Sequence, residues 1–299
     1  MSSLIKFCYF RIMRSKVLLV FFFISLGIML LFPLLYTILS TQLGDQVSIV
    51  FGPYSLRLLA FAGVSYMNTG LSMVVVFILL SMGISIFIGG ELNSGAIRNQ
   101  VTAGFSRTKI YYAYLIAVLS VPLAAIIAGT IIIFGIGIIA NAINPTDLFE
   151  TLSYPEFYAR YIILLIAFMG FLALVFNFAI RFNNRSFPML MGSLIIPMSM
   201  TIGPLIMMML FLNIGGYDTA EEIEQFTKTV SWFPSNIFNS LISANPTHLG
   251  NESGLNGLMS YPYMSLENYV IIKGAVFFSL FSALSIVSGH LLFKRREFK

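Results

Sequence analysis

The sequence predicts an all-α membrane protein with six transmembrane helices, an N-terminal amphipathic helix at the membrane interface, and a short extracellular helical element between spans five and six. Its 299 residues are 58% hydrophobic and 10% charged, whereas a soluble domain typically carries about 25% charged residues. Long apolar runs, with a mean hydropathy of +0.90 over the whole chain, alternate with clusters of basic residues. These two observations indicate that the bilayer is the solvent of this chain.

The positions of the basic residues predict the topology. Four clusters of Lys and Arg lie at 6–16, 98–109, 181–185 and 294–299. Loops that keep Lys and Arg stay on the cytoplasmic side, so both termini and two internal loops are expected there. This assignment puts thirteen bases and two acids inside and four bases and ten acids outside, which accounts for all 17 Lys and Arg and all 12 Asp and Glu of the chain. The net charge of +5 therefore reflects topology, and the expected contact is membrane lipid rather than nucleic acid.

Residues 1–16 form the first predicted unit, ahead of a six-span domain at 17–299. At 100° per residue, a helix over about 2–15 has an apolar half and a basic half, as interfacial helices do. The apolar half holds Leu4, Ile5, Cys8, Tyr9, Ile12 and Met13, and the basic half holds Lys6, Arg11 and Arg14. Cys8 is the single cysteine, so no intrachain disulfide is expected. We expect it to be a packing residue, with palmitoylation as the alternative.

Six apolar segments follow, at about 17–39, 67–88, 111–140, 161–180, 189–212 and 269–293. Each is close to the roughly 20 residues that a spanning helix needs, and unpaired backbone groups cannot be left in lipid, so each must be helical. Proline lies inside several spans and predicts kinks there; the positions are Pro33, Pro122, Pro197 and Pro204. In the outer loop at 213–268, aromatic residues around Trp232 predict a short helical element over 230–244 at the outer leaflet.

Span six carries a row of small residues, which let helix backbones approach closely. The row consists of Ser279, Ser282, Ser285, Ser288 and Gly289. We expect it to pack against a neighbouring span of the same chain, with a subunit interface as the alternative.

Motifs for chemistry on this chain are absent from the sequence. Nothing matches GxxxxGK[ST], so we expect no bound cofactor and no enzyme activity. With only His248 and His290, a histidine-based metal site is not expected either. An intramembrane protease that uses Ser193 and His290 is the enzyme alternative. An ion-coupled secondary carrier is the other alternative, although the span interiors lack the ionisable residues that such carriers usually need.

The loop between spans two and three is the most informative one. Its polar positions are Glu91, Gly95, Arg98, Asn99, Ser106 and Arg107. Gly95 permits a tight turn, and Ser106 is placed to cap the next helix. The pattern predicts a short, rigid, polar elbow that transmits a push from a docked partner. A local ion pair between Glu91 and Arg98 is the alternative, and when exposed it would contribute only about 0–1 kcal/mol.

This loop resembles the corresponding loop of ABC-2-type transporter permeases, the membrane subunits of bacterial ATP-binding-cassette exporters. Glu91, Gly95, Arg98 and the pair Ser106-Arg107 occupy the places of that family's glutamate, glycine, base and Ser-Arg. The resemblance implies two ATPase subunits, which carry the ATP and Mg, and a second permease that is a copy of this chain or a paralogue. It also implies a plasma-membrane location and ATPase contacts at 91–109 and at the N-terminal helix. The outer loop departs from the family by its length.

Span five suggests the substrate, because seven methionines lie between 189 and 209 and methionine suits varied apolar partners. We expect this span to line a cavity through Met191, Met198 and Met207, with Asn177 of span four as a polar candidate. Ordinary filling between helices is the alternative. A greasy cavity fits an amphipathic or hydrophobic substrate, such as a peptide or a lipid-like molecule. Within the resembled family this favours antimicrobial-peptide export or self-protection.

Overall fold

The computed structural model describes residues 2–43, 71–143, 155–182, 186–192 and 268–295. The regular structure in these ranges is helical throughout. The helices are α1 (Ser2–Arg14), α2 (Lys16–Leu43), α6 (Leu71–Asn93), α7 (Ala96–Thr102), α8 (Arg107–Ile143), α10 (Pro155–Arg181), α11 (Ser186–Leu190) and α15 (Asn268–Lys294). The predicted outer element at 230–244 and most of span five lie outside the described residues, so both stay predictions.

Among the described residues, four helical stretches are long and apolar enough to cross a membrane. They are Val75–Asn93 in α6, Arg107–Ile132 in α8, Ile162–Arg181 in α10 and Ile272–Lys294 in α15. These stretches coincide with the predicted spans two, three, four and six and confirm a multi-pass helical membrane protein. Helix α2 covers the predicted span one, with a shorter apolar stretch at Lys16–Ile28.

The helix limits differ from the predicted ones on both sides of the elbow, which is the segment 94–106 between α6 and α8. Helix α6 continues to Asn93 instead of ending near 88, and α8 begins at Arg107 instead of 111. An apolar run marks only the part of a helix that lies in hydrocarbon. Extending an existing helix by a few polar residues costs little free energy, because the helical nucleus is already formed. Helix α8 also continues through Pro122.

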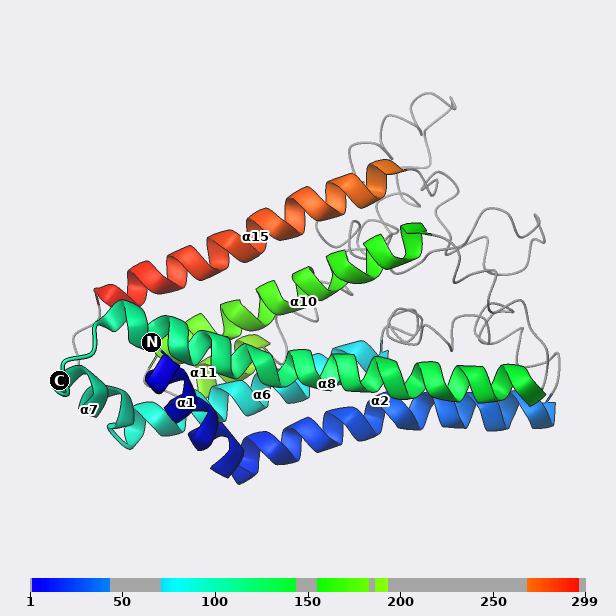
Figure 1. Cartoon of the computed structure of the whole chain (residues 1–299), viewed down its shortest axis with the longest axis horizontal. Coiled ribbons are helices and arrows are strands. Elements are labelled where there is room, and N and C mark those ends of the chain that lie inside the picture. The colour runs from blue at the N-terminus through cyan, green and yellow to red at the C-terminus, as the bar shows by residue number, and fades with distance from the viewer. Residues whose placement is uncertain (1, 44–70, 144–154, 183–185, 193–267, 296–299) are drawn as a thin grey trace, which may run out of the picture.

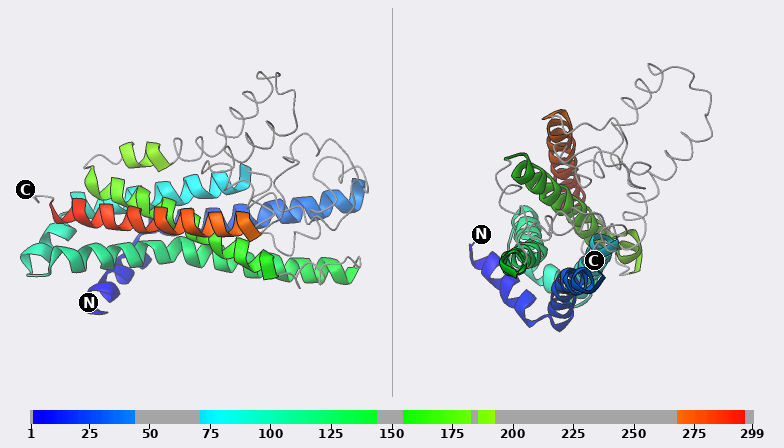
Figure 2. Two further views of the ribbon diagram at one scale, coloured as in Figure 1. Left: turned by 90° about the horizontal axis from the view of Figure 1, so that it is seen from above. Right: turned by 90° about the vertical axis from the view of Figure 1, so that its right-hand side faces the viewer.

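The long helices run side by side as a bundle (Figures 1 and 2). Helix α10 packs most extensively on α15, whereas α2 packs on α6 and α8, and α6 also contacts α10. The rings of Phe77 in α6 and Phe168 in α10 meet edge to face, with centroids 5.3 Å apart. Gly83 allows α2 to approach α6, because a Cβ there would lie 3.2 Å from the Cβ of Phe21.

Between α2, α6 and α8 the bundle leaves a small apolar cavity of ≈ 10 Å³. Its lining residues are Leu18, Phe21, Leu80, Gly83, Ile84, Val118, Val121 and Pro122. This volume is about the least that holds one water molecule. The cavity is therefore far too small for a substrate.

The interface of α10 and α15 depends on small residues. A Cβ added to Gly170 would lie 3.1 Å from the Cβ of Ser282, and one added to Gly289 would overlap the side chain of Asn177. Ser282 and Gly289 both belong to the predicted row of small residues. Ser282, Ser285 and Gly289 therefore pack against a span of the same chain, as expected, whereas Ser279 and Ser288 of the row are exposed.

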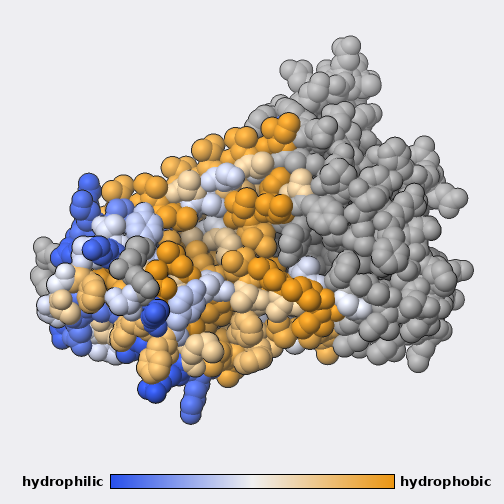
Figure 3. Space-filling view, in the orientation of Figure 1, coloured by the Kyte–Doolittle hydropathy of each residue, from blue (hydrophilic) through white to orange (hydrophobic). Residues whose placement is uncertain are grey.

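Hydrophilic residues gather at one end of the bundle (Figure 3). This end collects α1, the first turns of α2 and α8, α7, and the last turns of α6, α10 and α15 (Figure 1). Among the described residues, the charged ones in and next to these segments are the bases Lys6, Arg11, Arg14, Lys16, Arg98, Arg107, Lys109, Arg181, Lys294 and Arg295, and the acid Glu91. We call this the basic end.

Candidate functional site

The elbow between α6 and α8 lies at the basic end and turns at two glycines with positive φ. Gly95, with φ 71°, immediately precedes α7, and Gly104, with φ 88°, follows it. A residue with a Cβ would be strained at such values. The N–H of Gly95 donates to the carbonyl of Leu92 at 3.2 Å. The tight turn predicted at Gly95 is confirmed, and the chain beyond it forms the short helix α7.

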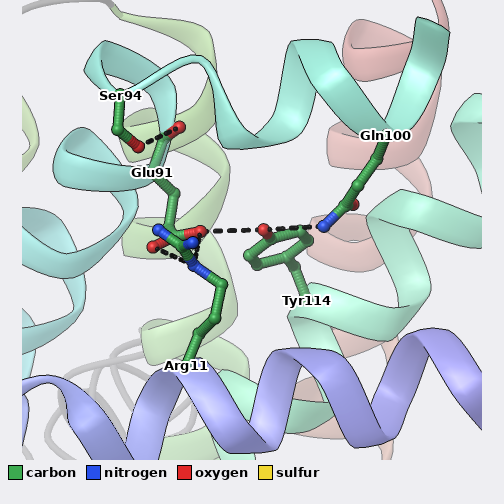
Figure 4. Close-up of polar contacts among 5 residues, drawn as sticks. All are labelled: Arg11, Glu91, Ser94, Gln100 and Tyr114. Carbon is green, nitrogen blue, oxygen red and sulfur yellow. Dashed lines mark hydrogen bonds and ion pairs between the residues drawn. The ribbon is translucent and has the colours of Figure 1, made fainter. Parts of the chain in front are cut away.

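Glu91, in the last turn of α6, is the centre of a buried polar network (Figure 4). The residue is 5% exposed. Arg11 of α1 places its Nε 2.9 Å from Oε1 and 2.8 Å from Oε2 of Glu91. The hydroxyl of Tyr114 in α8 donates to Oε2 at 2.9 Å, and Ser94 donates to the main-chain carbonyl of Glu91 at 3.3 Å. One carboxylate therefore ties together α1, α6 and α8.

Helix α7 joins this network through Gln100. Its Nε2 donates to the hydroxyl of Tyr114 at 3.1 Å, and the residue is 7% exposed. Its Oε1 is buried and has no hydrogen-bond partner in the described part of the chain. Ile97, 1% exposed, anchors the same face of α7 in the core. A displacement of α7 therefore acts on Tyr114 and, through Tyr114, on Glu91.

Arg11 reaches Glu91 because the apolar side of α1 docks on the bundle. Leu4, Cys8 and Ile12 belong to the hydrophobic core, and α1 packs mainly on α8. The hydrogen bond to Glu91 raises the pKa of Arg11 above its ordinary value. Burial, helped by the charge of Glu91, raises the pKa of Cys8 to about 12. Since the thiolate is the reactive form, the docked helix disfavours the palmitoylation alternative.

The outward side of α7 is polar. Arg98, Asn99 and Thr102 are exposed, and the hydroxyl of Thr102 donates to the carbonyl of Asn99 at 2.9 Å. The alternative of a local ion pair between Glu91 and Arg98 is wrong, because the partner of Glu91 is Arg11. The turn at Gly95 is the physical reason. It starts a new helix that carries Arg98 outward.

The start of α8 contacts the end of α15. Helix α8 begins directly after Ser106, whose carbonyl accepts the N–H of Ile110 at 3.1 Å. Arg107 donates from Nη1 to the carbonyl of Lys294 at 2.8 Å, and a cation is favourable at the carboxyl end of a helix. The elbow is thus linked to the last span as well.

A second polar cluster joins α8, α10 and α15. The hydroxyl of Tyr111 lies 2.8 Å from Oδ1 of Asn177 and 3.0 Å from the carbonyl of Ile286. Nδ2 of Asn177 donates to the carbonyl of Ser285 at 2.6 Å. Asn177 is only 6% exposed, and both ends of its amide are bonded. These contacts give it a role in holding helices together, and the cavity role that we expected stays a prediction.

The remaining candidates are only partly covered. Met191 is half-buried just after α11, whereas Met198, Met207 and Ser193 lie outside the described residues. His290 places Nε2 3.1 Å from the hydroxyl oxygen of Thr108. Within the described ranges, no group of three His, Cys, Asp or Glu side chains could hold a metal ion.

Sequence reasoning missed the partners of the two polar clusters. Arg11, Gln100 and Tyr114 surround Glu91, and Tyr111 holds Asn177. One signal was available in the spacing of the two tyrosines, because residues three apart share a helix face. A second was the position of Arg11 beside the apolar half of its helix.

Comparison with protein-family models, with curated proteins and with solved structures found no match to this chain.

Proposed function

We propose that this chain is the permease subunit of an ATP-driven exporter of the ABC-2 type, with six spans, in a bacterial plasma membrane. The observation that carries the proposal is α7, a short helix exposed at the basic end. A buried network ties it to α1, α6 and α8. Such a helix suits the docking of a partner subunit, because a force on it is transmitted to several helices at once.

The charge distribution supports an inside position for this end of the bundle. Of the residues that the structure describes, ten bases and one acid lie in and next to its segments, and cytoplasmic loops carry the excess of Lys and Arg. In the proposed topology both termini are cytoplasmic. Helix α1 is then an interfacial helix, and α7 faces the cytoplasm.

The network explains how a push on α7 would be transmitted. Gln100 holds Tyr114, and Tyr114 holds Glu91, which Arg11 also pairs. Breaking the partly buried pair of Arg11 and Glu91 costs about 2–3 kcal/mol once the 35% exposure of the Arg11 side chain is allowed for, so the helices resist sliding past one another. We propose that Arg98 and Asn99 contact an ATPase subunit, and that its closure on ATP moves α6 and α8 together with α7.

In this proposal the partner subunits bind and hydrolyse the ATP. The chain has no phosphate-binding loop of the GxxxxGK[ST] kind, so ATP and Mg bind the two ATPase subunits. A second copy of the chain or a paralogue completes the transmembrane unit. The substrate is an amphipathic or hydrophobic molecule, peptide or lipid-like, and antimicrobial-peptide export or self-protection fits it. The methionine-rich span five, with Met191 near its start, supports this substrate class.

An ion-coupled carrier is the second candidate, and Lys273 is the observation that favours it. This residue is 5% exposed in α15, and a buried ionisable residue in a span is a common mark of an ion path. Its position near the start of α15 also suits a lysine that reaches the membrane boundary. Export that continues after the ion gradient is collapsed, while ATP is present, would exclude the carrier.

The test of the exporter uses Arg98→Ala in the full complex, with Arg295→Ala as the matched control. Arg295 is an exposed base at the same end but outside α7. We expect the Arg98→Ala complex to assemble and hydrolyse ATP while export falls, and the control to export normally. Normal export by Arg98→Ala would contradict the role of α7. A purified chain that binds no ATPase subunit would contradict the proposal as a whole.

A further inference from the structure

Helix α1 has two opposite faces in different surroundings. Leu4, Cys8 and Ile12 are buried in the core. At 3.6 residues per turn, six exposed residues fall within an arc of about 120° on the opposite side. This arc, which we call the outward face of α1, consists of Ser3, Lys6, Phe7, Phe10, Met13 and Arg14.

The outward face combines large apolar side chains with positive charge. Phe7 is 41% exposed, Phe10 54% and Met13 67%. The guanidinium of Arg14 lies 4.2 Å from the centre of the Phe10 ring. An apolar patch next to bases marks a surface that binds something other than water. Arg11 is not part of this face, because it is paired with Glu91.

Helix α1 lies at the level where the apolar part of the bundle begins. Helix α2 starts at Lys16, two residues after α1 ends, and is apolar from Val17 onward. Glu91, the partner of Arg11, lies in the last turn of α6. Both views of Figure 2 place α1 at the periphery of the bundle. Its outward face therefore lies beside the bundle, at the height expected of lipid headgroups.

We propose that the outward face of α1 binds the headgroups of anionic phospholipids in the cytoplasmic leaflet. Phe7 and Phe10 enter the boundary of the acyl chains, and Lys6 and Arg14 contact the phosphates. Charge complementarity selects this occupant, because the described part of the basic end carries ten bases against one acid. An anionic leaflet strengthens the binding of such a segment about fivefold for each base. The inference goes beyond the exporter proposal and does not depend on it.

The test places a fluorescent reporter on this face of the full chain. Trp232 is the single tryptophan, so Phe10→Trp in a Trp232→Phe background gives one emitter on α1. The chain, without any ATPase subunit, is reconstituted in phosphatidylcholine vesicles that contain an equal share of brominated phosphatidylglycerol or of brominated phosphatidylcholine. We expect quenching by both lipids and stronger quenching by the brominated phosphatidylglycerol.

Two charge variants separate the outward face from the rest of the basic end. Lys6→Gln with Arg14→Gln should weaken the preference for phosphatidylglycerol by roughly 5- to 25-fold. Lys294→Gln with Arg295→Gln, at the end of α15 and just after it, should leave this preference unchanged. Equal quenching by the two lipids, or a preference that survives the loss of Lys6 and Arg14, would overturn the proposal. Emission typical of tryptophan in water, without quenching, would show that the outward face is exposed to solvent. Quenching that disappears when ATPase subunits bind would show that the face binds a protein instead.

Discussion

Replacing Arg11 by alanine should release α1 from the bundle without unfolding the spans. The substitution removes the Nε that contacts both oxygens of Glu91, and leaves the carboxylate with Tyr114 as its remaining side-chain partner. Stripping one partner from a buried ion pair costs about 3–5 kcal/mol. The Arg11 side chain is 35% exposed, so solvent screening lowers our value to about 2–3 kcal/mol.

Hydrogen exchange of the α1 amides measures this cost directly, because local opening sets their exchange rate. A loss of 2–3 kcal/mol corresponds to roughly 30- to 150-fold faster exchange. The exchange is measured in a neutral detergent, where no anionic lipid contacts α1, and the matched control is Arg14→Ala, because the Arg14 side chain is exposed and contacts the Phe10 ring. Surface substitutions of that kind change stability by about 0.5 kcal/mol or less, so exchange in the control should rise by no more than about twofold.

A second substitution identifies the charge on Glu91 as the cause. In the Arg11→Ala background, Glu91→Gln removes the unpaired carboxylate, so the double variant should exchange more slowly than Arg11→Ala alone. Such a cycle isolates the interaction between the two residues. The reasoning fails if Arg11→Ala and Arg14→Ala exchange equally fast, or if Glu91→Gln speeds the exchange further.

Two more substitutions test packing and ionisation. Gly289→Ala should lower the free energy of unfolding by about 2–4 kcal/mol, because the new Cβ displaces Asn177 from its hydrogen bonds. The control is Gly27→Ala, where a Cβ meets nothing within 4 Å. Equal midpoints of the two variants in a thermal melt would refute the close contact at Gly289. Cys8, with its pKa raised to about 12, should react with a maleimide at about pH 8 roughly a thousandfold more slowly than Met13→Cys in a Cys8→Ala chain. Similar labelling rates for the two thiols would show that α1 does not stay docked. The raised pKa means that folding favours the neutral Cys8 thiol. The contribution of this thiol to stability is therefore present below about pH 9 and is lost as the pH rises towards 12.

The turn in the site's backbone could be predicted from the sequence, whereas the helix α7 and the partners of the side chains could not. The turn at Gly95 follows from the residue itself, because glycine tolerates positive φ. The pairing of Glu91 with Arg11 joins residues 80 positions apart. The local candidate, Arg98, was closer in sequence but is carried outward by α7.

By itself, the sequence determined that the chain is a helical membrane protein, where four of its spans lie, and where the elbow turns. Hydropathy, charge and glycine act over a few residues, so local pattern suffices for these features. Only the tertiary structure decided which faces meet. A helix that is apolar all round, such as α6, carries no stripe that marks its partner. The partners of Glu91 and Asn177, and the outward side of α1, follow from packing.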